Sequence, residues 1–138
     1  MILLDTSGVL AALDSAQRAH TEAAAALSDA APPLLLSPLV LAELDYLLAA
    51  RVGQAARTSL LAEVDRGAYQ LQTFSVSDLR AALAVIRRYA DLGVSLADAS
   101  IVALADRHGV REVLTLDERH FRVLTTGGRP FRLLPADA

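Results

Sequence analysis

The sequence predicts an α/β sandwich of three layers, in which helices flank a mostly parallel central sheet. Short apolar runs that suit buried strands alternate with longer segments of helical periodicity along the whole chain. The 138 residues fit one domain of ordinary size, and no repeat or linker-like stretch divides them. A hydrophobic share of 54% is enough for a substantial core. We therefore expect a single domain over residues 1–138.

Five segments are the expected strands. The third alternates polar and apolar residues, as a half-buried strand does, and the others are short and mainly apolar. In chain order these strands are residues 2–4, 34–36, 69–74, 113–115 and 131–134.

Six segments are the expected helices. Ser37 and Pro38 open one of them, since they are a capping residue and a proline at the first helical position. Leu41, Leu44, Leu47 and Leu48 then have the spacing of one buried face. In the helix over residues 77–89 we expect Leu79, Leu83 and Ile86 to point inward. The remaining helices are expected over residues 7–13, 18–28, 54–66 and 95–108, the last ended by Gly109.

Composition narrows the class of protein. The chain has no cysteine, which excludes a disulfide scaffold and a thiolate zinc site and favours a cytoplasmic location. No run approaches the ~18 apolar residues of a membrane span, and the first residues lack the basic region of a signal peptide. The net charge of −3 is not that of a general nucleic-acid coat. All 13 basic residues are arginines. A GC-rich coding bias explains this preference, as does phosphate binding by some of the arginines, and both can apply.

Four carboxylates are expected to meet at the carboxyl edge of the sheet, where the active crevice of such folds lies. Asp5 follows the first strand directly, and Asp117 follows the strand at 113–115 after one residue. Glu43 lies on the second turn of the helix that Ser37 opens, and Asp98 lies in the first turn of the helix at 95–108. Crowded carboxylates raise one another's pKa values unless a cation is bound. Carboxylate ligands favour Mg²⁺ or Mn²⁺, which suit phosphodiester hydrolysis.

Each acid also has a structural interpretation. Asp98 completes the capping-box pattern that begins at Ser95, Asp5 can cap the following helix, and Asp117 can begin a turn. Glu43 has apolar neighbours in the sequence, so it lies either on the exposed stripe of its helix or binds a ligand. We expect Asp45 to be solvated.

Four blocks of the sequence have a recognisable pattern. They are Leu3-Leu4-Asp5-Thr6-Ser7, the run from Ser37 to Leu44, the run from Ser95 to Ala105, and the run from Leu114 to Phe121. Together they resemble the VapC-type toxins of the PIN-domain ribonuclease family. The blocks cover nearly the whole chain in the family's order and spacing.

The resemblance implies a metal-dependent endoribonuclease, the toxin of a type II toxin–antitoxin system, with a PIN-like fold. Asp5 and Asp98 would be direct Mg²⁺ or Mn²⁺ ligands, Glu43 would complete the shell or orient the attacking water, and Asp117 would act through water. Thr6 or Ser7 could assist, and Thr115 could steady Asp117. The implied partners are RNA, a VapB-type antitoxin and a second copy of the chain in a homodimer, but no membrane.

Other residues and other classes are less consistent with the sequence. The three histidines lack metal-ligand spacing, and His120 is expected to pack beside an anchoring Phe121. Gly127 and Gly128 indicate a turn, while Arg87, Arg88 and Arg119 either lie on solvated helix faces or bind phosphate. A response-regulator receiver needs a lysine, and a dehalogenase-type phosphatase needs an acid where Ser7 stands. A catalytically silent binding module with the PIN fold remains the alternative. The sequence leaves open which RNA is cut, whether one or two ions act, and which antitoxin binds.

Overall fold

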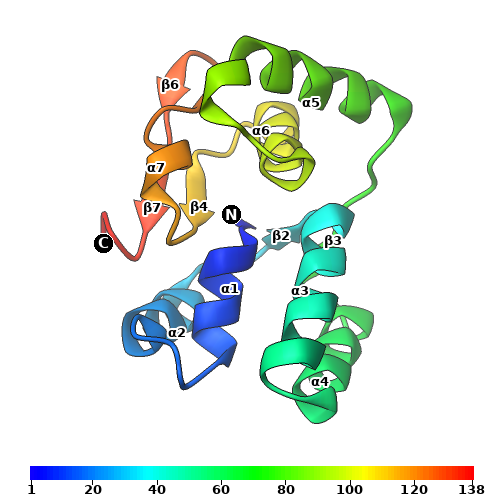
Figure 1. Ribbon diagram of the computed structural model, residues 1–138, viewed down its shortest axis with the longest axis vertical. Coiled ribbons are helices and arrows are strands. Elements are labelled where there is room, and N and C mark those ends of the chain that lie inside the picture. Colours follow the sequence, from blue (N-terminus) through cyan, green and yellow to red (C-terminus); the bar gives the residue numbers. More distant parts are fainter.

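A five-stranded parallel sheet forms the centre of the computed structural model, which describes residues 1–138 (Figure 1). The strand order is β3-β2-β1-β4-β7, with β1 at Ile2–Leu4, β2 at Leu34–Leu36, β3 at Gln70–Leu71, β4 at Glu112–Leu114 and β7 at Arg132–Leu134. The chain therefore runs outward from β1 to β3 and then returns to the other side of β1. The crevice where ligands bind in such sheets lies at this reversal, beyond the ends of β1 and β4.

Helices cover both faces of the sheet. Figure 1 shows α1 to α4 gathered on one side and α5 with α6 on the other. The bounds are Thr6–Leu13 for α1, His20–Asp29 for α2, Pro38–Arg51 for α3, Gln54–Asp65 for α4, Val76–Arg88 for α5 and Leu96–His108 for α6. The expected three-layer α/β arrangement is therefore confirmed, and none of these helices has the length and apolar character needed to cross a membrane.

The core lies where the two helical layers meet the sheet. Leu3 on β1 and Leu114 on β4 are fully buried, as expected for central strands covered on both faces. Val40, Leu44 and Leu48 form the buried face of α3, with Leu41 and Leu47 half-buried beside them. The spacing of the leucines thus predicted the inward face of α3 correctly, apart from Val40.

The inward face predicted for α5 is wrong at two of its three positions. Leu79 and Leu83 are 44% and 40% exposed, and Val76 is 71% exposed, whereas Asp78 and Ala82 are buried. Ile86 is half-buried against the core, as predicted. Val76, Leu79 and Leu83 of α5 therefore form a partly exposed outer stripe.

Several short elements at the C-terminal end were not predicted. A four-residue helix, α7 (Glu118–Phe121), follows Asp117, and a hairpin of β5 (Thr125–Thr126) and β6 (Arg129–Pro130) turns at Gly127 and Gly128. A 3-10 turn at Ala90–Leu92 precedes α6, and the expected strand at 69–74 shrinks to β3. The predicted turn at the two glycines and the anchoring role of Phe121 are confirmed, since Phe121 is buried and packs edge-to-face on Phe131 with ring centroids 5.8 Å apart.

Candidate metal centre

Asp5 is the most deeply placed acid of the crevice. It lies between β1 and α1, at the N-cap position of that helix, but its side chain makes no capping hydrogen bond. Instead Oδ2 accepts hydrogen bonds from the Ser7 hydroxyl at 2.7 Å and the Thr115 hydroxyl at 2.6 Å. Burial raises the pKa of Asp5 to about 6, against the opposing effect of these two donors. The two hydroxyl groups hold the carboxylate in place, but it is poorly solvated, so a bound cation would stabilise its charged form.

A close approach of α1 to β4 holds Asp5 in the crevice. A Cβ atom added to Gly8 would lie 2.5 Å from the Leu114 carbonyl oxygen, so a side chain cannot be placed there without movement. One residue earlier, the Ser7 hydroxyl accepts a hydrogen bond from the backbone N–H of Leu116 at 2.9 Å. The start of α1 is therefore fastened to the segment that leads to Asp117.

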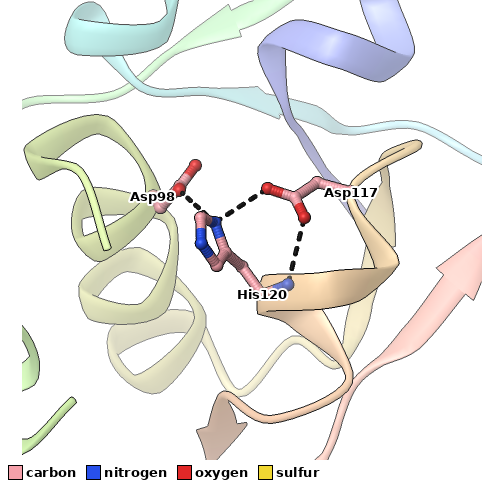
Figure 2. A group of neighbouring side chains, drawn as sticks. All are labelled: Asp98, Asp117 and His120. Atoms are coloured by element: carbon pink, nitrogen blue, oxygen red, sulfur yellow. Dashed lines mark hydrogen bonds and ion pairs between the residues drawn. The ribbon is translucent and has the colours of Figure 1, made fainter. Parts of the chain in front are cut away.

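Asp98 enters the crevice from the first turn of α6. Its backbone N–H donates to the Ser95 hydroxyl at 3.1 Å, so the serine caps the helix as the sequence pattern indicates. The Asp98 carboxylate instead faces Asp117 and His120 (Figure 2). Burial, followed by the negative charge of Asp117, raises the pKa of Asp98.

Asp117 both caps a helix and faces the crevice. Its Oδ1 accepts from the backbone N–H of His120 at 3.0 Å, which opens α7, so the structural interpretation of this acid is correct as far as it goes. Its Oδ2 points toward the His120 ring, 2.9 Å from Nδ1 (Figure 2). The backbone N–H of Asp117 donates to the Thr115 hydroxyl at 2.9 Å. Thr115 therefore links Asp117 to Asp5, because the same hydroxyl donates to Asp5.

Glu43 faces the crevice from the second turn of α3. It is exposed, and its Oε1 accepts a hydrogen bond from the Thr6 hydroxyl at 2.6 Å. Asp45 lies two residues further along and pairs with Arg57, so it is engaged in a surface ion pair away from this group.

The structure brings Asp98 and Asp117 within reach of one ion, whereas Glu43 and Asp5 are not part of that close group and are coupled to Asp98 through their charges. The charges of Asp117 and Glu43 both act to raise the pKa of Asp98. The charge of Asp98 in turn contributes to the raised pKa of Asp5. Carboxylates from four separate segments thus repel one another in a partly buried place, an arrangement that a multivalent cation would stabilise.

His120 belongs to this group, although the sequence pointed to packing only. Its Nδ1 lies 3.3 Å from Asp98 Oδ2 as well as 2.9 Å from Asp117 Oδ2. A three-residue separation in a helix puts Asp117 and His120 on the same side, which is the one signal that could have indicated the contact. The other two histidines lie elsewhere, with His20 on the Ala11 carbonyl and His108 on the Gln72 side chain.

The residues present fit a divalent cation. One oxygen each from Asp98 and Asp117 and one nitrogen from His120 all lie within 4.8 Å of one another. The buried His120 Nδ1 atom makes no hydrogen bond of good geometry, and its polar neighbours are the carboxylates of Asp98 and Asp117. Carboxylates suit Mg²⁺ and Mn²⁺, and an imidazole nitrogen suits transition-metal ions.

Comparison with known proteins defines the family. The sequence model of the PIN domain matches residues 2–125, and the chain belongs to the PIN domain family. Among its relatives is Ribonuclease VapC26 of Mycobacterium tuberculosis, which is 39% identical over 135 residues, a length that covers 97% of this chain and 100% of the relative. The resemblance to VapC-type sequences is therefore confirmed.

Solved structures that share this fold include the following two. The first is VapC20 of M. tuberculosis, a toxin that cleaves the sarcin–ricin loop, with a TM-score of 0.79 at 22% identity, covering 85% of this chain and 90% of that one. The second is FitAcB from Neisseria gonorrhoeae, with a TM-score of 0.62 at 26% identity, covering 86% and 88%. These matches confirm the predicted PIN-like fold.

Proposed function

We propose that this protein is a divalent-metal-dependent endoribonuclease and the toxin component of a type II toxin–antitoxin system. The observation that carries the proposal is the charge coupling of the other three acids to Asp98, which is unfavourable without a cation. The 39% identity to Ribonuclease VapC26 over almost the whole chain supports RNA as the substrate.

The side chains of the crevice have distinct parts in the proposed reaction. Asp5 and Asp98 would hold the ion directly, and Asp117 would hold it directly or through water. A bound Mg²⁺ or Mn²⁺ would supply a positive charge for the phosphate and a more acidic water. Thr115 and Ser7 keep the Asp5 carboxylate in place through the hydrogen bonds described above.

Glu43 is suited to orient the attacking water. It is the exposed acid of the group, so it can reach solvent, and the Thr6 hydroxyl limits its movement. Exposed arginines near the crevice, such as Arg119 beside His120, would contact the RNA backbone. A chain with a net charge of −3 would then bind RNA locally through the ion and these arginines.

The proposal includes two protein partners. A VapB-type antitoxin follows from the VapC-type resemblance, and such a toxin would act in the cytoplasm, where its RNA lies. A homodimer is supported by the outer stripe of α5, formed by Val76, Leu79 and Leu83, because an amphipathic helix whose apolar residues face solvent is suited to a partner surface. Light scattering should give twice the chain mass for the native protein and a single chain mass for a Leu79→Glu, Leu83→Glu variant.

The experiment that tests the activity uses total bacterial RNA and purified protein freed of any antitoxin. Cleavage is measured with Mg²⁺, with Mn²⁺ and with EDTA, beside an Asp5→Ala variant and an Asp65→Asn control, since Asp65 is an exposed acid on the far end of α4. We expect discrete products with metal, which disappear with EDTA and in the Asp5 variant but not in the control. RNA that stays intact with folded protein under every condition would favour the silent binding module.

A further inference from the structure

The ring of His120 is oriented by a backbone carbonyl. Its Nε2 lies 3.1 Å from the carbonyl oxygen of Leu92, in the turn before α6. A carbonyl oxygen can only accept, so Nε2 carries the proton of this hydrogen bond. In a neutral ring the electron pair is therefore on Nδ1, the atom that faces the acids. A histidine that binds a metal through one nitrogen commonly donates its other N–H to a carbonyl in this way.

The surroundings of Nδ1 are those of a ligand atom. The atom is buried and has no hydrogen-bond partner, although carboxylate oxygens of Asp117 and Asp98 lie 2.9 and 3.3 Å away. An electron pair on Nδ1 would be repelled by these two carboxylates unless a proton or a cation lay between them. Figure 2 shows the three side chains converging on one point.

The position of the ring is held by packing as well as by hydrogen bonding. The next residue, Phe121, is fully buried and packs against Phe131. The backbone N–H of His120 is bound by the Asp117 carboxylate. The imidazole is therefore placed before any ion binds, and little side-chain entropy remains to be lost on binding.

We propose that His120 joins the acids of the crevice as a further ligand of the divalent ion, through its Nδ1 atom beside Asp98 and Asp117. The inference deepens the proposed function, on which it rests, by specifying a mixed oxygen and nitrogen ligand set. An imidazole nitrogen favours Mn²⁺ and later transition ions over Mg²⁺, which prefers oxygen. The site should accordingly bind Mn²⁺ more tightly than a site of carboxylates alone would.

The direct test is pulsed electron paramagnetic resonance on the intact protein loaded with one equivalent of Mn²⁺. We expect the modulation of a directly bound ¹⁴N nucleus, which changes to that of ¹⁵N when the protein is labelled with ¹⁵N-histidine. This measurement needs no variant, so it does not depend on whether a substitution folds. His20→Gln and His108→Gln, whose side chains lie elsewhere, should keep the nitrogen signal, and His120→Gln should lose it.

Calorimetry on the same proteins gives a second measurement. His120→Gln should weaken Mn²⁺ binding at least about tenfold. Mg²⁺ binding should weaken less than about threefold, because Mg²⁺ favours oxygen ligands. Absence of nitrogen coupling in the native protein, or absence of Mn²⁺ binding, would overturn the inference.

Failure of this inference is distinguishable from failure of the proposed function. Metal-dependent RNA cleavage without nitrogen coupling would leave the ribonuclease and remove His120 from the ligand set. Nitrogen coupling in a folded protein that cleaves no RNA would leave the ligand set and remove the ribonuclease.

Discussion

The first turns of α5 and α6 have the same local pattern, a capping serine followed three residues later by an aspartate. Ser75 accepts from the backbone N–H of Asp78 at 3.3 Å, and Ser95 accepts from that of Asp98 at 3.1 Å. The two aspartate carboxylates nevertheless have opposite surroundings. The Asp78 carboxylate is bound by its own helix and by Arg107. The Asp98 carboxylate faces Asp117 and His120 instead.

Asp78 is a structural acid. Its Oδ2 accepts a hydrogen bond from the backbone N–H of Ser75 at 2.9 Å, which completes the capping box. The same oxygen also accepts from Arg107 at 2.7 Å. The backbone hydrogen bond from Ser75 is the main cause of a lowered pKa, and Arg107 adds to it. Burial and the charge of Asp117 instead raise the pKa of Asp98. A capping pattern therefore locates the start of a helix, but the tertiary neighbours decide what its acid does.

The largest expected effect is the loss of RNA cleavage in Asp98→Asn, for which Asp78→Asn is the matched control. Asp98→Asn should lower RNA cleavage at least about 100-fold, since even residues that only support metal ligands contribute 10- to 100-fold. Its free energy of unfolding in EDTA should stay equal or rise, because repulsion with Asp117 and Glu43 is relieved. Cleavage is measured under saturating Mn²⁺, and activity that survives in Asp98→Asn would contradict its assignment as a ligand.

The next effect is on the pH dependence of stability, where the two kinds of acid should have opposite signs. The pKa of Asp5 is raised from 3.8 to about 6 in the folded protein, so its carboxyl favours folding below pH 4 and that contribution is lost as the pH rises toward 6. The Asp5→Asn variant should therefore be more stable than the native protein at pH 7 in EDTA, by up to about 3 kcal/mol. Urea unfolding between pH 3 and 8 measures the difference.

The contribution of Asp78 should run the other way with pH. Its lowered pKa means that the stability it provides is present above the ordinary value of 3.8 and is lost as the pH falls through the lowered value. At neutral pH the native protein should be more stable than Asp78→Asn and less stable than Asp5→Asn. Both differences should shrink at low pH. Parallel curves for both variants would show that the two acids do not differ.

A smaller effect is expected for Asp78→Asn at neutral pH. The variant should lose about 1–2 kcal/mol of unfolding free energy, since it weakens a helix cap and a buried partner of Arg107. RNA cleavage by the folded variant should equal that of the native protein. A folded Asp78→Asn protein without cleavage would place this helix in the active site and undo the comparison.

The smallest effect should be common to both helices. Ser75→Ala and Ser95→Ala each remove an acceptor for a first-turn N–H, so each should cost about 1 kcal/mol. Thermal unfolding in EDTA measures both. A loss at one serine only would show that the two caps are not equivalent even though their local geometry is the same.

The fold was largely predictable because its signals are local. The three-residue apolar strands at Ile2–Leu4 and Leu34–Leu36 and the start of α3 after Ser37 coincide with the sequence prediction. The α5 stripe was assigned to the wrong side, because hydrophobic periodicity reports an apolar face and not what covers it. The short α7 was missed, since four residues are too few for a periodic pattern and its cap is made by Asp117.

The sequence by itself determined the parallel α/β architecture and the family, through apolar periodicity and the order of the four motifs, and it predicted the four acids as the site. The tertiary structure alone decided that Asp5 is buried and held by Thr115, that Asp98 faces other acids while Asp78 does not, and that His120 stands between Asp98 and Asp117. The physical reason is that periodicity and capping depend on neighbours within a few residues. Burial, charge repulsion and ligand spacing depend instead on segments about a hundred residues apart, such as Asp5 and Thr115, which only the folded chain brings into contact.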